Sequence, residues 1–238
     1  MLNPDYSKRI VAIALLATLV LGLSGCAYIR LLKFKNQLKD FDEYLIVQTA
    51  NGLSLELKKP VVKNSDLVFI TESNPTQKEE APTSANREIW TWRFHKKIDP
   101  SQNSPYAVDF KTHFHDQLLH QLDFDPKLIE IVPPDFLLSM VKSLGKAKIS
   151  KLRKVISAEV DAEDLDIQKL PTLGEIFDTM GKPSSKAVSK KTHSYEYVFN
   201  FLNPDDDSVE GQFTVTFKSK DGKNESPVSG FKMTAKGR

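Results

Sequence analysis

Apolar and polar residues alternate along several segments of the chain, which is the period of a half-buried β-strand. Leucines alternate with polar residues over 53–58, and the Asn51-Gly52 dipeptide before them favours a two-residue hairpin with a strand over 44–50. Three more segments have strand character, and they cover residues 67–71, 88–98 and 106–114. The first half of the chain is therefore expected to form antiparallel strands.

Aromatic residues gather on one side of the segment 88–98, where Trp90 and Trp92 alternate with polar residues. Segment 106–114 has the same pattern, so the two segments are predicted to pair as neighbouring strands with this stripe in the core. A ligand-binding face is the alternative for the stripe. Residues 72–87 contain no large apolar side chain, which predicts a mobile loop before this pair of strands.

Helical spacing replaces alternation in the middle of the chain. Pro134 suits a first helical turn, the apolar residues over 136–144 follow the helical period, and Gly145 is placed to end the helix. A shorter helix is expected over 116–122.

The C-terminal part has the order helix, strand, strand, strand, and its helix is predicted over 173–180, after Pro171. The alternating strands cover residues 195–201, 213–217 and 231–235, which predicts a three-stranded antiparallel meander. Because strands come in runs and do not alternate regularly with helices, the fold class is expected to be α+β with a mainly antiparallel sheet and a few packing helices.

The first residues have the layout of an export signal. Two basic residues precede an uncharged, mostly aliphatic run over 10–23, which ends in the tetrapeptide Leu23-Ser24-Gly25-Cys26. The cysteine is the only one in the chain. The uncharged stretch extends to Ile29, so an uncleaved membrane-spanning helix is the alternative interpretation.

The segment 1–26 resembles the lipobox signal of bacterial lipoproteins. The resemblance implies cleavage between Gly25 and Cys26, diacylglycerol on the sulfur of Cys26, and acylation of the new amine by a fatty acid such as palmitate. Ala27 follows the cysteine, which for lipoproteins of Gram-negative bacteria implies sorting to the outer membrane, facing the periplasm. The lipid anchor and the uncleaved helix both place the remaining residues outside the cytoplasm.

Removing residues 1–25 leaves 213 of the 238 residues, and the net charge falls from +2 to near +1 because Lys8, Arg9 and Asp5 are removed. Such a charge balance is unlike that of a nucleic-acid-binding protein. With Cys26 acylated, no cysteine remains for disulfides or thiolate metal sites. The predicted organisation is a signal peptide over 1–25, an α+β region over 26–160 and a C-terminal region over 161–238, with one continuous domain after the signal as the alternative.

Charged residues change sign abruptly in the middle of the chain, where a basic stretch is followed by an acidic one over 159–166. The two stretches either pair with each other in solvent or provide a basic patch for anionic lipid or an acidic envelope partner. The basic stretch consists of Lys142, Lys146, Lys148, Lys151, Arg153 and Lys154. Four more basic residues follow the anchor and either face an anionic leaflet or lie at a solvated strand edge; these are Arg30, Lys33, Lys35 and Lys39.

His113, His115 and His120 are the weak candidates for a metal site. On a strand, His113 and His115 share a face with Asp109 and Lys111, and two imidazoles can bind a metal if a third ligand approaches. A polar strand face that leads into a helix is favoured, so no cofactor is expected. Sequence motifs of serine hydrolases, zinc proteases and nucleotide-binding proteins are absent.

Residues 170–238 resemble the small outer-membrane lipoproteins of the barrel-assembly machinery, the BamE (SmpA/OmlA) family. The shared pattern is a helix that ends in a Gly-x-Pro turn, here Met180-Gly181-Lys182-Pro183, followed by three strands. Members of that family are much shorter than this chain. The resemblance implies a role in outer-membrane assembly or maintenance, and no binding residues are carried over from it.

The leading hypothesis is a non-catalytic envelope lipoprotein that binds another envelope component at a membrane. A carrier of lipid or another hydrophobic ligand and a metal-dependent hydrolase of envelope polymers are the alternatives. An apolar cavity under the central helix would favour the carrier, and convergence of His113, His115 and a carboxylate would favour the hydrolase. A filled core with an exposed apolar patch would favour the binding role.

Reversing the charges of Lys148, Lys151 and Arg153 should weaken association of the lipid-free protein with anionic vesicles or lipopolysaccharide, because the basic stretch is expected to contact phosphate groups. Raised salt should have the same effect on the unaltered protein. Association that is unchanged and insensitive to salt would contradict the hypothesis, and stoichiometric zinc in the purified protein would favour the hydrolase.

Overall fold

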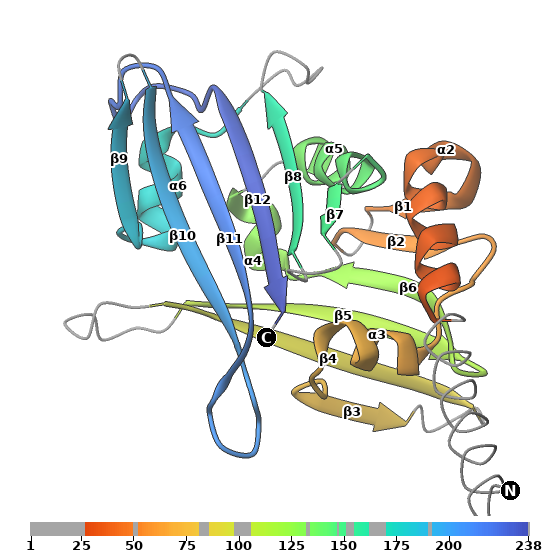
Figure 1. The fold of residues 1–238 in the computed structure, drawn as a ribbon. Coiled ribbons are helices and arrows are strands. Elements are labelled where there is room, and N and C mark those ends of the chain that lie inside the picture. Colours follow the sequence, from red (N-terminus) through yellow and green to blue (C-terminus); the bar gives the residue numbers. More distant parts are fainter. Residues whose placement is uncertain are drawn as a thin grey trace, which may run out of the picture.

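The computed structural model describes most of the chain after Cys26. The described residues are 27–49, 52–80, 86–97, 106–131, 134–146, 148–150, 155–161, 170–189 and 192–237. They form a twelve-stranded sheet in which every pairing is antiparallel, together with several short helices (Figure 1). The expected α+β class with a mainly antiparallel sheet is confirmed.

Ten strands follow one another across the sheet in the order β1-β2-β6-β5-β4-β10-β11-β12-β8-β7, while β3 pairs with β4 and β9 pairs with β10. The strands are β1 (Leu45–Gln48), β2 (Ser54–Leu57), β3 (Gln77–Glu80), β4 (Arg87–Lys96), β5 (Ala107–His115), β6 (Leu118–Phe124), β7 (Lys148–Ser150), β8 (Val155–Asp161), β9 (Ser185–Ser189), β10 (Thr192–Leu202), β11 (Val209–Ser219) and β12 (Gly230–Gly237). The helices cover 27–39, α2 (Phe41–Tyr44), α3 (Asn64–Thr71), α4 (Pro126–Ile131), α5 (Pro134–Leu144) and α6 (Leu173–Met180).

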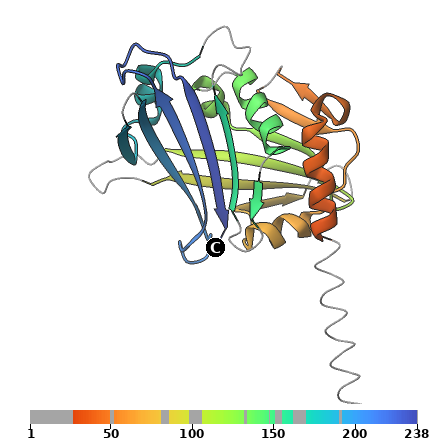
Figure 2. The same cartoon turned by 45° about the horizontal axis from the view of Figure 1, so that its top comes forward.

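The sheet bends where β4 meets β10. The two strands pair only at Phe94, His95 and Lys96 of β4, and in Figure 2 the yellow-green strands β4–β6 run across the blue strands β10–β12. The pairing of β8 with β12 joins residues 155–161 to the C-terminal strands. The regions before and after residue 160 thus contribute strands to one sheet.

Several predicted elements are confirmed. β1 and β2 form the expected hairpin, with Gly52 at a φ of 117°. The expected two-residue turn is wrong, because Gln48 lies opposite Ser54 and five residues separate this last pair. β4 and β5 pair along their lengths, and Trp90 and Trp92 are buried in the core. α5 and α6 lie where helices were expected, and β10, β11 and β12 form the predicted meander.

Residues 67–71 belong to α3, so the prediction of a strand there is wrong. The backbone N–H of Lys63 donates to the carboxylate of Asp66 at 2.9 Å, which satisfies a free donor at the start of the helix. Leu67 and Val68 both pack against the same core cluster. Neighbouring residues can share a face on a helix but face opposite sides of a strand, so the packing of this pair requires the helix.

Two other expectations between the strands are also wrong. Residues 116–122 are not a helix, because Asp116 and Gln117 form a two-residue turn with φ values of 50° and 67° and β6 follows at once. Positive φ at both positions matches a type I′ turn, which Asn-Gly signals far more strongly than Asp-Gln.

The segment 72–87 is not a loop throughout, because it contains β3, which pairs with β4. Residues 81–85 lie outside the described residues.

Three clusters of buried apolar residues fill the space between the sheet and the helices. The largest combines β10–β12 with α6 and with Leu137 of α5. The second contains both tryptophans, and the third joins Leu38 to Val141 of α5. Phe94 packs against the first two clusters and Leu122 against the last two, so the clusters form one continuous core.

The end of helix 27–39 meets the end of α5 at close range. A Cβ atom on Gly145 would lie 2.4 Å from the backbone nitrogen of Lys39, and real Cβ atoms essentially never come within 3.0 Å of such a neighbour. Gly145 follows the last residue of α5, as expected for a residue that ends a helix. The close approach of the two helix ends is a second reason why a residue without a side chain is required there.

Gly145→Ala should lower the free energy of unfolding by about 2 kcal/mol, because the two helix ends must separate to admit a methyl group. Urea denaturation of the purified chain measures the change, and Lys146→Ala at the exposed neighbouring position is the matched control. Equal stability of the Gly145→Ala variant and the unaltered chain would show that these helix ends are not in firm contact.

Candidate functional site

The predicted anchor lies directly before the described chain. Gly25 and Cys26 are outside the described residues, and helix 27–39 is the first described element. In the part of the chain that the structure describes, none of the helices combines the length and the apolar character needed to cross a membrane.

Helix 27–39 is packed onto the domain from its first described residue. Ala27 and Leu38 are buried, and Leu31 and Phe34 pack against the core. The inner face of the helix thus covers the second and third core clusters. This packing joins the residue after Cys26 to the core without an intervening linker.

A buried ion pair ties the same helix to α3. Nε and Nη2 of Arg30 donate to the two carboxylate oxygens of Asp66 at 2.7 and 2.6 Å, and the Asp66 side chain is 2% exposed. Bidentate, charge-assisted bonds of this kind are among the stronger polar contacts in proteins. The four basic residues that follow Cys26 all lie on helix 27–39, so the strand-edge interpretation is wrong.

The basic stretch predicted to bind anions is only partly described. The ammonium group of Lys142 lies 3.1 Å from a carboxylate oxygen of Asp42, and Lys146 is exposed. Lys148 belongs to β7. Outside the described residues lie Lys151, Arg153 and Lys154. Anion binding by this stretch stays a prediction.

The candidate metal-binding histidines lie in two separate places. Nε2 of His113 lies 2.6 Å from a carboxylate oxygen of Asp123, whereas the ring of His115 lies beside that of His120, with 5.6 Å between centroids. Partial burial, with a smaller effect of His115, lowers the pKa of His120. Among the described residues, no group of three or more His, Cys, Asp or Glu side chains is arranged to hold a metal ion.

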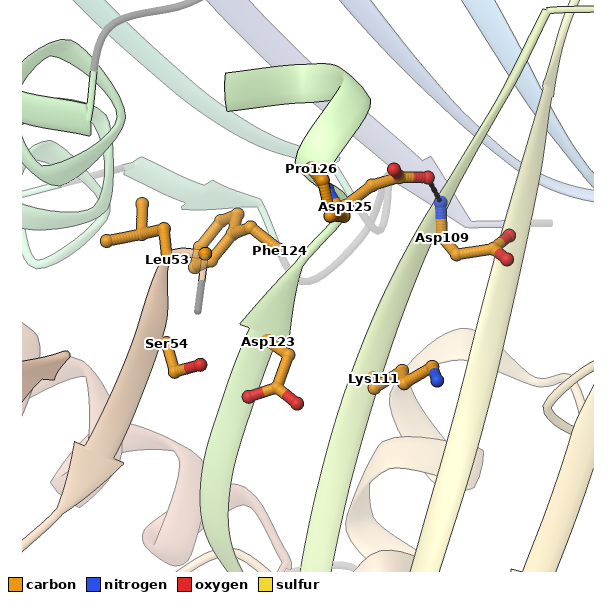
Figure 3. Close-up of a pocket in the computed structure, with 9 residues that line it drawn as sticks. Leu53, Ser54, Asp109, Lys111, Asp123, Phe124, Asp125 and Pro126 are labelled. Atoms are coloured by element: carbon orange, nitrogen blue, oxygen red, sulfur yellow. Dashed lines mark hydrogen bonds between the residues drawn. The ribbon is translucent and has the colours of Figure 1, made fainter. Parts of the chain in front are cut away.

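A polar pocket of about 330 Å³ lies where β2, β6 and β5 meet the start of α4 (Figure 3). Strand register places Ser54, Asp123 and Lys111 in one row across the three strands. Asp125 points toward Asp109 in Figure 3 and accepts its backbone N–H at 2.8 Å, while its other carboxylate oxygen caps the first turn of α4. Three of the nine residues that line the pocket are therefore aspartates, one on β5, one on β6 and one directly after β6.

The aspartates of the pocket already have donors from the protein. Arg93 binds Asp109 through two bonds of 2.8 and 2.7 Å, which lower the pKa of Asp109 against an opposing effect of burial. Burial raises the pKa of Asp123, but hydrogen bonds, led by that from His113, outweigh it and lower the pKa overall. Both carboxyl groups are ionised at neutral pH.

Strand register places Ser54 opposite Asp123, and His113 hydrogen-bonds to the Asp123 carboxylate at 2.6 Å. In acyl-transfer triads the imidazole lies between hydroxyl and carboxylate and takes the hydroxyl proton. Here the carboxylate lies between the other two groups, and its lowered pKa makes it a weak base at neutral pH. The arrangement orients polar side chains but does not pair a hydroxyl with an imidazole.

Sequence reasoning did not single out Ser54 or Arg93. Both reach the aspartates only through strand register, since Ser54 lies opposite Asp123 and Arg93 lies opposite Asp109. Alternation indicates which side of a strand carries the polar residues, but it does not indicate which strands become neighbours.

No known protein family, curated protein or solved structure matches the chain. The resemblance of residues 1–26 to lipoprotein signals and of 170–238 to the BamE family therefore stays a prediction. In the structure, β9 extends the predicted meander beyond β10, and β8 extends it beyond β12.

Asp123→Asn should lower the free energy of unfolding by about 1 kcal/mol at neutral pH, because a neutral amide replaces the charged acceptor of the hydrogen bonds from His113 and Gln121. In the unaltered protein this contribution is fully present above the ordinary aspartate pKa of about 4. It is lost as the pH falls through the lowered pKa of folded Asp123, so the difference in stability should shrink in acid.

Urea denaturation across this pH range measures the effect of Asp123→Asn. Asp205→Asn, in an exposed turn, is the matched control and should leave stability unchanged at every pH. A stability difference that persists undiminished in acid would contradict the role assigned to the Asp123 charge.

Proposed function

We propose that this protein is a non-catalytic lipoprotein of the bacterial envelope, held by Cys26 at a membrane surface and binding another envelope component there. The observation that carries the proposal is the packing of helix 27–39, which follows Cys26 directly and is buried at Ala27 and Leu38. An anchor at Cys26 would therefore lead into the domain core without a flexible tether. The domain would act close to the bilayer.

The N-terminal sequence supports membrane attachment on physical grounds. Each buried methylene of an acyl chain contributes about 0.8 kcal/mol, and two or more chains give stable anchoring. An uncleaved helix over 10–29 is the alternative anchor, and it leads to the same packed helix. Ala27 after the cysteine supports the outer membrane, and the resemblance of 170–238 to the BamE family supports a role in its assembly or maintenance.

Burial of α5 against the sheet supports a binding role over a lipid carrier. Leu137 and Val141 of α5 are buried in clusters that they share with sheet residues, while Ile29 and Phe69 are exposed. Apolar side chains that remain exposed next to a filled core are expected where a surface binds a partner or a membrane. A hydrolase has less support, because two of the aspartates of the polar pocket are already bound by protein donors, Asp109 by Arg93 and Asp123 by His113.

Cys26→Ser should abolish lipid attachment, because the substitution removes the sulfur that accepts diacylglycerol. When the full chain is expressed in a Gram-negative host, the unaltered protein should lose residues 1–25, gain the mass of its acyl chains and fractionate with the outer membrane. The Cys26→Ser variant should be soluble or remain an uncleaved precursor. Intact-mass analysis and membrane fractionation measure both outcomes.

Ser24→Ala keeps a small residue near the cleavage site and serves as the control, which should be processed normally. An unaltered protein that retains Met1 and carries no acyl chains would overturn the lipid anchor. If that precursor stayed in the membrane, the uncleaved helix would be the anchor instead.

A further inference from the structure

Exposed apolar residues gather at the end of the domain nearest the predicted anchor. Of the seven large apolar side chains that are exposed in the described part of the chain, three lie on helix 27–39 and α3. Ile29 is 53% exposed, Leu32 is 37% exposed and Phe69 is 53% exposed. Figures 1 and 2 both place α3 beside the first turns of helix 27–39.

The outward side of helix 27–39 changes character along its length. Ile29, Leu32, Lys33 and Asn36 recur at helical spacing and are all exposed, whereas the residues between them are buried or half-buried. The apolar members of this stripe occupy the end next to Cys26, and the polar members follow. A helix with this gradient is suited to touch an apolar layer with its first turns, while its later turns remain in water.

Phe69 belongs to the same surface through the ion pair between the two helices. Arg30 lies on the first turns of helix 27–39 and binds Asp66 in the first turn of α3. Phe69 follows Asp66 by three residues, which is about one turn of α3. This partly buried ion pair therefore holds an exposed aromatic side chain near the apolar start of helix 27–39.

We propose that Ile29, Leu32, Lys33 and Phe69, here called the anchor-side surface, contact the phospholipid bilayer that holds the Cys26 anchor. This inference rests on the proposed membrane attachment. The helix advances roughly 7.5 Å along its axis from Ala27 to Leu32. Interfacial helices bury apolar side chains about 5–10 Å into the boundary between headgroups and acyl chains. An anchor at Cys26 thus brings the bilayer within reach of Ile29 and Leu32.

Lys33 gives this contact a preference for anionic lipid. It is exposed immediately after Leu32, at the point where the stripe changes from apolar to polar. A basic side chain at this level lies among the headgroups when the apolar residues before it are inserted, and it is attracted to anionic phosphates.

Tryptophan quenching by brominated lipid tests the contact directly. The full acylated chain is reconstituted into phosphatidylethanolamine and phosphatidylglycerol vesicles that contain lipids brominated on their acyl chains. Ile29→Trp and Phe69→Trp each add an exposed tryptophan, while the native Trp90 and Trp92 are buried and supply a constant background. The added emission should fall roughly twofold if the side chain lies in the interface.

Val188→Trp, at a position on β9 that is 71% exposed, is the matched control and should keep its emission. All three sites are exposed, so the variants should melt at the temperature of the unaltered chain. Lys33→Glu, combined with Ile29→Trp, should reduce quenching in these vesicles and have no effect in vesicles of phosphatidylcholine alone. If quenching at position 29 is the same with and without Lys33→Glu, and the same in anionic and neutral vesicles, the role of Lys33 is wrong.

Intact mass and vesicle flotation of the same samples report the anchor separately. If the protein floats but positions 29 and 69 are quenched no more than position 188, the bilayer contact is wrong and the proposed anchor stands. A protein that neither carries acyl chains nor floats overturns both proposals. Blue-shifted but unquenched emission would mean that a second copy or another protein covers the anchor-side surface, and this result too would overturn the contact.

Discussion

The carboxylate of Asp66 is almost fully buried, and the arrangement of the N-terminal half of the molecule depends on how this charge is paired. An unpaired buried charge costs several kcal/mol, so its partners are structurally required. Arg30 supplies two bonds, and the backbone N–H of Lys63 supplies a third. These bonds join helix 27–39 to α3 over the cluster that contains both tryptophans. The helix after the predicted anchor is consequently a structural part of the domain.

A second buried charge holds the bend of the sheet. Lys96 is 5% exposed at the junction of β4 and β10, and its ammonium group donates to the backbone carbonyl of Met180 at the end of α6. The same group lies 5.2 Å from the centroid of the Tyr197 ring. Burial lowers the pKa of Lys96, while the partial negative charge at a helix C-terminus favours the cation. The C-terminal helix is therefore tied to the strand junction by a charge-assisted hydrogen bond as well as by apolar packing.

The packing of helix 27–39 against the core affects how an anchored domain would bind a partner. A domain on a flexible tether would sample many orientations, and a partner would have to restrict them. Here the helix after Cys26 shares the core with the sheet, so an anchored domain would present its surfaces in a restricted set of orientations to the bilayer. Such preorganisation lowers the entropic cost of association with a partner in the same membrane. The proposed bilayer contact would restrict the orientation further, because it adds α3 as a second point of attachment.

Local patterns determined a large part of this protein. Strand alternation and the Asn51-Gly52 turn predicted β1 and β2, and helical spacing predicted α5 and α6, because each signal lies within a few neighbouring residues. The lipobox-like end at Cys26 is likewise a local signal. Tertiary structure alone decided α3, the turn at Asp116 and Gln117, and the meeting of Ser54 and Arg93 with the aspartates of the polar pocket. Each of these features depends on contacts with residues that are distant in the sequence. Burial and strand register that depend on such contacts cannot be read from the few residues on either side of a position.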